Sequence, residues 1–501
     1  MLDGLIPALR HTPDRPAVVT ARRRGGVRVH VTRGELADLA EGYAGALHRR
    51  GLAAGDTLAL AVRPGGRALA VMLAAHRLGL RVAVADPTVG PDVLTARLTL
   101  ARPALVLADA VAQAVAGWAR PVGRRAQVEL PALSSLAPVV TVGPRLPGCA
   151  PALRPQADPT PRVGSGGDAV IVFTSGTTSS PRGVVHTWAS LDAGMRAVAG
   201  LVDPAPDRPV LGGTFFVLVP SLAAGAPVAR PARGGRGVAA ALRALRPQAT
   251  YLTPPQLRSA LDAGARFTGR VYSGSAPVTA SLLQRVRAAG ADEAWGVYAL
   301  TELFPAAAVE AAEKAAFDGD GDLVGDLLPG VSGAVDAGGQ LLLAGPGACD
   351  RYLGEAPQRQ VATGDVARLE QGPGGTRVVL AGRCKDMVLR RAENIYPGLY
   401  EPGLHVPGVR LAVLVGVPAE DGDERLVAVV EPEPGADARR VRAALAGPFA
   451  RMGTARPDAV VLAPVPLAGR SRKPDRVAAA RLAARLTRGP QAATVSPRGA
   501  R

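Results

Sequence analysis

Apolar and polar residues alternate along the N-terminal third in a pattern that predicts helices and strands in turn. Thr32 and Glu35 form a predicted capping box at the start of one helix. The apolar residues that follow share one helical face: Leu36, Leu39, Tyr43 and Leu47. The same reasoning predicts strands over 57–62, 81–85 and 104–107 and helices over 67–78 and 91–100. This alternation favours an α/β fold in which helices wrap mostly parallel sheets.

The pattern changes near residue 386, where glycine and charged residues follow a strand-like segment over 377–381. Two further strand-like segments, 411–417 and 425–430, then predict a smaller α/β unit. We therefore expect a large domain over residues 1–385 and a small, mobile C-terminal domain over 386–485. The basic segment 486–501 contains glycine and proline, and we expect it to be disordered.

The composition is that of a globular protein, with 48% hydrophobic and 20% charged residues in a chain of 501. No apolar run approaches the length of a membrane span, and residues 1–20 carry charges where a signal peptide would be apolar. We therefore expect a cytoplasmic protein. The cysteines Cys149, Cys349 and Cys384 are too few and too widely spaced to indicate a disulfide framework or a metal knuckle.

The formal net charge of +17 raises the hypothesis of nucleic-acid binding. The arginines are nevertheless spread along the whole chain, and no basic stripe is interleaved with aromatic residues. We therefore expect no specific nucleic-acid partner, and a salt-dependent DNA shift would expose one. The positive field still favours anionic substrates. Only three residues are lysines, Lys314, Lys385 and Lys473, which suggests that a lysine is kept where a compact ammonium is needed.

The segment 173–183 reads Phe-Thr-Ser-Gly-Thr-Thr-Ser-Ser-Pro-Arg-Gly and follows an apolar run over 169–173 that predicts a buried strand. The sequence after Val184 is compatible with a helix start. A strand–loop–helix unit would direct backbone N–H groups, hydroxyls and a helix N-terminus at one point, which suits a polyphosphate. The alternative is a solvated Ser/Thr/Gly loop. The ordered spacing T-S-G-T-T-x-x-P-[KR]-G favours the phosphate loop, although G-x-x-x-x-G-K-[ST] is absent.

This loop resembles the phosphate loop of the AMP-forming adenylating enzymes, the superfamily of acyl-CoA synthetases, peptide-synthetase adenylation domains and luciferases. Two positions depart from the usual T-S-G-T-T-G-x-P-K-G, because Ser179 replaces a glycine and Arg182 replaces the lysine. The sequence assigns no role to Ser179. The resemblance implies that these residues bind the ATP phosphates: Thr174, Ser175, Gly176, Thr177, Thr178 and Arg182.

Two further segments resemble motifs of the same family. Tyr298-Ala-Leu-Thr-Glu302 is similar to Y-G-x-T-E. The resemblance implies that Tyr298 lies against adenine, that Thr301 contacts phosphate and that Glu302 binds Mg²⁺, a hard cation suited to a carboxylate. Thr-Glu is also typical of a helix start when it stands alone. The segment that is similar to the adenine-pocket loop consists of Ser273, Gly274, Ser275, Ala276 and Pro277.

Thr363-Gly-Asp365 resembles the family's T-G-D, which implies that Asp365 accepts hydrogen bonds from the ribose hydroxyls. In Gly382-Arg-Cys-Lys-Asp386, the resemblance implies that Arg383 meets the ribose and that Asp386 is the hinge of the small domain. An ordinary Gly-Asp turn and a structural linker are the alternatives for these two segments.

Lys473-Pro-Asp-Arg476 resembles the family's G-K-[IV]-D-R, with Arg472 in place of the glycine. The resemblance implies that Lys473 reaches from the small domain to the reacting carboxylate and α-phosphate and is the main catalytic residue, together with Thr301 and Glu302. The alternative is a solvated charge in a basic tail. The resemblance runs from Thr32 to Arg476, and its motifs occur in the family's order.

The family resemblance implies ATP-dependent activation of a carboxylic acid as its acyl-adenylate, with release of pyrophosphate and transfer to CoA, a carrier protein or another acceptor. Arg391 and Ala392 replace the Gly-Gly usual before Glu393, so CoA stays one candidate among several. The alternatives are β-lactone formation and nitrite-dependent diazotisation. A degenerate nucleotide-binding protein is a further alternative, against which Thr301, Glu302 and Lys473 argue. The sequence indicates neither the acid nor the oligomeric state.

Overall fold

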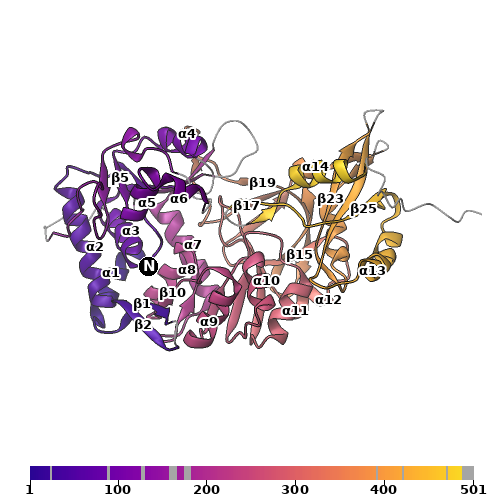
Figure 1. Cartoon of the computed structure of the whole chain (residues 1–501), viewed down its shortest axis with the longest axis horizontal. Helices are drawn as coiled ribbons and strands as arrows, with labels where there is room; N and C mark the ends of the chain where they lie inside the picture. The colour runs from indigo at the N-terminus through magenta and orange to yellow at the C-terminus, as the bar shows by residue number, and fades with distance from the viewer. Residues whose placement is uncertain are drawn as a thin grey trace, which may run out of the picture.

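The computed structural model describes the chain except for residues 23–24, 87–90, 126–129, 157–165, 174–181, 391–392, 420–422, 470–471 and 488–501. Two large sheets and their helices account for the chain as far as Arg383. Smaller sheets follow at the C-terminal end of the molecule, coloured orange to yellow in Figure 1.

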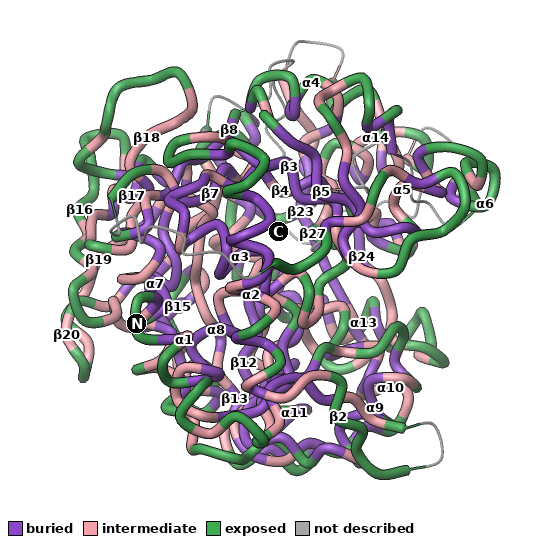
Figure 2. The backbone as a smooth tube through the Cα atoms, turned by 90° about the vertical axis from the view of Figure 1, so that its left-hand side faces the viewer, coloured by how far each residue is buried: buried purple, intermediate pink, exposed green. Residues whose placement is uncertain are grey.

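The first large sheet has seven strands among the described residues, in the order β18-β8-β7-β4-β3-β5-β6. Its strands are β3 (Thr57–Ala61), β4 (Arg81–Val84), β5 (Leu105–Ala108), β6 (Val139–Thr141), β7 (Asp168–Phe173), β8 (Gly183–Thr187) and β18 (Arg351–Tyr352). The run from β7 to β6 is parallel, whereas β8 and β18 pair antiparallel at one edge. Every residue of β3 is buried, as expected for a strand covered on both faces (Figure 2).

The second large sheet has thirteen described strands, in the order β16-β17-β19-β20-β15-β14-β13-β12-β11-β9-β10-β1-β2. Its first half comprises β1 (Pro16–Ala21), β2 (Val27–Thr32), β9 (Val210–Leu211), β10 (Val228–Ala229), β11 (Ala249–Tyr251), β12 (Arg270–Ser273) and β13 (Glu293–Tyr298). The second half comprises β14 (Ala307–Glu310), β15 (Asp322–Leu327), β16 (Ser332–Val335), β17 (Gln340–Ala344), β19 (Val361–Gly372) and β20 (Gly375–Arg383). Pairing is parallel from β1 through β13 and antiparallel from β13 to β16. The carboxyl ends of the parallel strands therefore share one edge, where ligands bind in open α/β sheets.

Helices cover these sheets, and the ones predicted from the sequence are present. The helices of the large region are α1 (Leu2–His11), α2 (Arg33–His48), α3 (Gly66–Leu78), α4 (Pro91–Ala101), α5 (Ala110–Ala116), α6 (Arg120–Arg125), α7 (Trp188–Val202), α8 (Phe215–Ala223), α9 (Gly234–Leu245), α10 (Pro254–Asp262), α11 (Ala280–Ala288) and α12 (Ala311–Ala316). The capping box of Thr32 and Glu35 begins α2 as predicted, and Leu36, Tyr43 and Leu47 are buried on its inner face. Three-residue 3-10 turns add η1 (Leu133–Ser135) and η2 (Cys384–Asp386).

The predicted helix start after Val184 is wrong. Residues 183–187 form β8, which pairs antiparallel with β7, and α7 begins only at Trp188. Val184 and Val185 are fully buried and β-branched, which suits a strand inside a sheet. The Thr187 side chain then accepts a hydrogen bond from the Ser190 amide at 3.1 Å and caps the helix. The phosphate loop therefore joins two strands of a hairpin, and no helix N-terminus follows it directly.

After Arg383 the chain forms separate small sheets with their own core. Their strands are β21 (Val388–Arg390), β22 (Glu393–Ile395), β23 (Val409–Pro418), β24 (Glu424–Pro432), β25 (Ala459–Leu462), β26 (Leu467–Ala468) and β27 (Lys473–Pro474). They are accompanied by η3 (Pro397–Leu399), η4 (Glu401–Leu404), α13 (Ala438–Arg451), η5 (Gly453–Ala455) and α14 (Arg476–Thr487). Buried residues from Val388 to Ala483 pack among themselves on the two faces of the β23–β24–β25 sheet. The domain limits at 385 and 486 stay predictions, and the predicted tail lies outside the described residues from 488 onward.

The architecture confirms the α/β prediction with a large N-terminal and a small C-terminal part. Parallel pairing is confined to the two runs named above, and antiparallel strands extend both sheets beyond them. Of the three cysteines, Cys149 and Cys349 are buried and Cys384 is exposed. No helix in the described ranges is both long and apolar enough to cross a bilayer.

Candidate active site

A cavity of about 2260 Å³ lies at the carboxyl edge of the parallel strands and extends between the large sheets and the small C-terminal part. Many of the residues predicted from the sequence line it: Ser275, Ala276, Pro277, Tyr298, Thr301, Glu302, Asp365, Arg383, Asp386 and Lys473. Ser273 is the last residue of β12 and Gly274 follows it, and neither is among the lining residues. The predicted phosphate-binding residues Thr174–Thr178 lie outside the described residues, as do Ser179, Arg391 and Ala392.

One end of the cavity carries a hydrogen-bonded group of three side chains. Asp365 on β19 and Arg383 on β20 are register partners, and Arg383 Nε donates to Asp365 Oδ1 at 2.7 Å. The hydroxyl of Tyr298, at the end of β13, donates to Asp365 Oδ2 at 2.6 Å. Burial, reinforced by Asp365, raises the pKa of Tyr298, so the phenol remains a donor. An ionised carboxylate has about four acceptor sites, so Asp365 can still accept hydrogen bonds from a diol.

The Thr301–Glu302 turn follows β13 and is fixed through its main chain. The Thr301 carbonyl contacts His186 Nε2 at 2.7 Å, and the Glu302 carbonyl accepts from the Cys349 amide at 2.6 Å. Leu303 forms an isolated antiparallel bridge with Ala348. The turn is therefore attached to two other parts of the chain, β8 and the segment before β18.

Tyr352 connects Glu302 to the end of the phosphate loop. Its hydroxyl donates to Glu302 Oε1 at 3.0 Å, and burial together with Glu302 raises its pKa. The Arg182 guanidinium lies 3.9 Å from the centre of the Tyr352 ring and 3.2 Å from Glu355. Sequence reasoning missed Tyr352 because a single tyrosine in a two-residue strand belongs to no motif. Its role becomes visible only through its neighbours in space.

Lys473 projects from the short β26–β27 hairpin into the cavity. Its side chain is open to the cavity, yet protein atoms surround the site, and this burial lowers the pKa of the ammonium group. Arg383 lowers the pKa further, whereas Asp365 and Glu302 oppose that effect. Among the described residues no carboxylate forms an ion pair with Lys473, so its charge is available to a ligand.

Asp386 is tied to the small C-terminal part. Its carboxylate pairs with Arg476 Nε at 3.0 Å, and Arg476 also donates to both oxygens of Glu401 at 2.7 Å and to the Leu414 carbonyl at 2.8 Å. The acidic partners raise the pKa of Arg476 despite its burial, so this guanidinium stays charged. The residue predicted to be the hinge is therefore held by the third residue after Lys473.

Glu302 fits the Mg²⁺ site that the family resemblance implies. The ranges that the structure describes contain no group of three His, Cys, Asp or Glu side chains able to enclose a metal. Mg²⁺ usually takes one or two protein carboxylates, completed by water and substrate phosphates. A single carboxylate that faces the cavity beside Thr301 is compatible with this mode of binding.

Beyond the polar end, the cavity wall is apolar. Phe216 on α8 and Phe304 lie with ring centres 3.9 Å apart, and Phe216 lines the cavity together with Met72 and Leu218. This surface suits an organic group that continues from the reacting carboxylate.

Comparisons with known proteins identify the family of this chain. The family model described as AMP-binding enzyme matches residues 7–353. An indoleacetate–CoA ligase from Aromatoleum aromaticum is 28% identical over 330 residues, which cover 58% of this chain and 63% of that ligase, less than two thirds of its length. The long-chain-fatty-acid–CoA ligase FadD13 from Mycobacterium tuberculosis is 26% identical over 448 residues, covering 80% of this chain and 83% of that ligase.

Solved structures are similar over nearly the whole chain. The amide bond synthetase McbA from Marinactinospora thermotolerans superposes with a TM-score of 0.73 at 24% identity, covering 95% of this chain and 99% of that one. The anthranilate CoA ligase AuaEII, solved with anthranoyl-AMP, gives a TM-score of 0.75 at 16% identity and covers 97% and 98%. These likenesses show the fold, and the family model covers more than half of the sequence. The chain belongs to the AMP-binding enzyme family.

Proposed function

We propose that this protein is an AMP-forming acid ligase, which activates a carboxylic acid as its acyl-adenylate and releases pyrophosphate from ATP. One observation carries the proposal: a single cavity brings together the Tyr298–Asp365–Arg383 group, the Thr301–Glu302 turn and the ammonium group of Lys473, which pairs with no described carboxylate. These groups come from β13 and the turn after it, from the neighbouring strands β19 and β20, and from β27, which are three separate regions of the sequence. Their chemistry matches a nucleoside, a polyphosphate and a reacting carboxylate in that order.

In the proposed reaction a carboxylate oxygen attacks the α-phosphate and pyrophosphate leaves. Asp365 and Arg383 bind the ribose, and Tyr298 lies against the base. Lys473 stabilises the negative charge shared by the carboxylate and the α-phosphate as the bond forms. Catalysis then consists of positioning and charge neutralisation, and requires no covalent intermediate with the enzyme.

Thr301 and Arg182 would contact the phosphates, and Glu302 would hold Mg²⁺, which supplies positive charge to the leaving pyrophosphate. Tyr352 donates to the Glu302 oxygen Oε1, so the other oxygen keeps its acceptor sites for the metal. The phosphate loop proper, Thr174–Thr178, remains a prediction from the sequence.

The small C-terminal part would turn about Asp386 between the two half-reactions and so exchange Lys473 for a second-step loop. Several relatives are named as CoA ligases, one solved relative as an amide bond synthetase, and one curated relative as a nonribosomal peptide synthetase. CoA, a carrier protein and an amine are therefore the acceptors to test first. A cytoplasmic location likewise remains a prediction from the sequence.

The test is pyrophosphate release with a panel of carboxylic acids and nitrite, each with and without CoA, followed by mass spectrometry of the products. We expect ATP-dependent release with at least one acid, and the products separate thioester, β-lactone and diazo outcomes. Lys473→Ala is the control for catalysis at this site. The absence of an adenylate with every acid, together with no effect of Lys473→Ala, would refute the proposal.

A further inference from the structure

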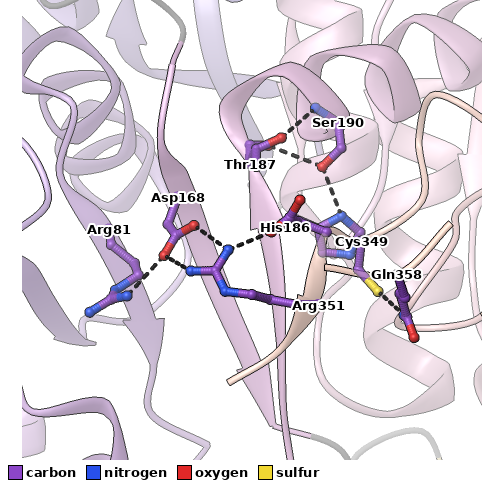
Figure 3. A network of polar contacts seen from close by, with 9 residues as sticks. Arg81, Asp168, His186, Thr187, Ser190, Cys349, Arg351 and Gln358 are labelled. Atoms are coloured by element: carbon purple, nitrogen blue, oxygen red, sulfur yellow. Dashed lines mark hydrogen bonds and ion pairs between the residues drawn. The ribbon is translucent and has the colours of Figure 1, made fainter. Parts of the chain in front are cut away.

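His186 is a buried imidazole beside the candidate active site to which the proposed reaction assigns no role. It lies on β8, its residue is fully buried, and its Nε2 is 2.7 Å from the Thr301 carbonyl oxygen. A carbonyl oxygen only accepts hydrogen bonds, so Nε2 must carry the hydrogen. The Nδ1 atom then faces Ser190 Oγ at 3.4 Å with its lone pair, as Figure 3 shows.

The same ring also contacts a phenylalanine that packs behind the apolar wall of the cavity. His186 and Phe304 meet edge to face, with ring centres 5.6 Å apart and planes inclined by 66°. Phe304 in turn packs against Phe216 at 3.9 Å. His186 therefore contacts both ends of the segment 301–304, at Thr301 and at Phe304, which supports the cavity-lining Phe216 from behind.

The chemistry of this position is that of a fixed neutral donor. Burial lowers the pKa of His186, so the imidazole stays uncharged near neutral pH. Burying an imidazole is unfavourable unless its nitrogen atoms form hydrogen bonds. An aliphatic side chain would fill the same space without needing any hydrogen-bond partner. A histidine here is therefore explained by its bond to the Thr301 carbonyl.

We propose that His186 is a positioning residue, which holds the Thr301–Glu302 turn so that the Thr301 hydroxyl and the Glu302 carboxylate face the phosphates and Mg²⁺. The inference rests on the proposed function. The nucleoside is bound by other residues, Tyr298, Asp365 and Arg383. Loss of the His186 donor therefore changes the phosphate and metal end of the site and leaves the nucleoside end intact.

Two substitutions separate the donor from the volume of the ring. His186→Phe keeps an aromatic ring against Phe304 and removes the donor, whereas His186→Gln keeps a neutral N–H donor of similar reach. Because a displacement of about 1 Å can cost roughly 100-fold in rate, we expect His186→Phe to lower kcat for pyrophosphate release roughly 10- to 100-fold. We also expect a higher Mg²⁺ requirement with little change in the ATP concentration at half-saturation, and substantial recovery in His186→Gln. Ser190→Ala removes the hydroxyl beside Nδ1 and its hydrogen bond to the Thr187 carbonyl, but leaves the His186–Thr301 contact in place. It is the matched control, and its kcat should stay within about twofold of the wild type.

A measurement without ligand tests the same inference independently of turnover. In hydrogen–deuterium exchange of the ligand-free protein, His186→Phe should raise exchange in a peptide covering 299–306 and leave β15 unchanged. Faster exchange throughout the chain, or wild-type kcat and Mg²⁺ dependence in His186→Phe, would overturn the positioning role. If the wild type releases no pyrophosphate with any acid, the proposed function fails, and the exchange result alone decides the role of His186.

Discussion

Lys473 lines the cavity and forms no ion pair with a carboxylate among the described residues. If it stabilises the charge of the forming adenylate, Lys473→Ala should lower the rate of adenylate formation by roughly 100- to 1,000-fold, as for the loss of one donor to a developing anion. ATP binding should change much less, because Asp365 and Arg383 hold the nucleoside. Single-turnover pyrophosphate release and calorimetric titration with ATP measure the two effects. A loss of ATP binding equal to the loss of rate would assign Lys473 to binding alone.

The lowered pKa of Lys473 predicts an alkaline limit to adenylation. The ammonium is the active form, and it is lost as the pH rises through a pKa that lies below the ordinary lysine value. We therefore expect kcat to fall on the alkaline side with an apparent pKa lower than that of an exposed lysine. Lys473→Arg keeps its proton throughout, so any residual activity should lack this limb. A wild-type profile that is flat to pH 10.5 would contradict the prediction.

Substitutions in the Tyr298–Asp365–Arg383 group should weaken ATP binding. Asp365→Asn removes the charge that both neighbours contact and replaces one acceptor oxygen by a donor. Hydrogen bonds to charged groups contribute about 1.5–3 kcal/mol, so ATP affinity should fall roughly 10- to 100-fold. Calorimetry with ATP measures this directly. Tyr298→Phe removes one donor to Asp365 without altering the charge, and should cost less than Asp365→Asn.

At the residue scale, motif order allowed the cavity residues to be predicted from the sequence. Tyr298, Glu302, Asp365 and Lys473 belong to segments with a recognisable arrangement of polar types. His186 belongs to an apolar strand, where a histidine is more often a satisfied core residue. Its relation to Thr301 depends on how β8 packs against the turn after β13, which no local pattern encodes.

At the element scale, Asp168 at the start of β7 joins three strands of the seven-stranded sheet. It accepts two parallel hydrogen bonds from Arg351 of β18, at 3.0 and 2.8 Å, and a third from Arg81 of β4 at 2.9 Å (Figure 3). The hydrogen bonds to Asp168 raise the pKa of Arg351. The ion pairs hold the edge strand that carries Tyr352 onto the sheet.

Asp168→Ala should therefore destabilise this sheet, because it removes the carboxylate between Arg81 and Arg351 and leaves Arg351 paired with Asp350 alone. Removing one partner of a buried pair costs about 3–5 kcal/mol, and partial exposure of these side chains reduces the expected loss to about 2–3 kcal/mol. Denaturant unfolding of the wild type and the variant measures this difference in the free energy of unfolding. Asp14→Ala, at an exposed position, is the matched control. A loss below about 0.5 kcal/mol, the range of ordinary surface substitutions, would show that the network adds nothing.

Sequence patterns predicted most elements of this region but not the hairpin of β7 and β8. The predicted strands and helices between Thr32 and Leu107 agree with the structure to within a residue or two, because their apolar spacing is regular. Residues 183–187 combine two valines with a histidine and a threonine, a stretch too short for its period to be diagnostic. These residues form a strand because they pair with β7 on one side and β18 on the other.

At the scale of the whole molecule, ion pairs connect α10 and α11 with the small C-terminal part. Arg285 lies 3.1 Å from Glu433, and Arg410 lies 3.3 Å from Asp262. Exposed pairs contribute only about 0.2–1 kcal/mol each, so they bias an orientation without locking it. Pairs of this strength are compatible with the proposed rotation of the small C-terminal part.

Replacing both acids, in Asp262→Asn/Glu433→Gln, should therefore shift the molecule toward other orientations. Small-angle scattering without ligand should show a larger radius of gyration for this variant than for the wild type. High salt should produce the same change in the wild type by screening the pairs. Identical scattering in all three conditions would mean that apolar contacts determine the orientation.

The large-scale division into two parts was accessible from the sequence, because charge and glycine interrupt the apolar pattern near Asp386. The shape of the cavity was not. It depends on the relative placement of β13, β19, β20 and β27, and hence on residues as far apart in sequence as Tyr298 and Lys473. Family resemblance supplied the grouping that local physics alone could not.

Cys384 offers a practical means of observing this protein at work. It is the exposed one of three cysteines and lies in η2, between Arg383 of the cavity and Asp386 of the proposed hinge. The other two are buried, and burial raises the pKa of Cys349 to about 11, so it reacts slowly with maleimides at neutral pH. A single fluorophore can therefore be attached at the pivot of the unmodified chain. Its emission can be followed while ATP, acid and acceptor are added in turn. The rates of the emission changes would then report the proposed rotation of the small C-terminal part.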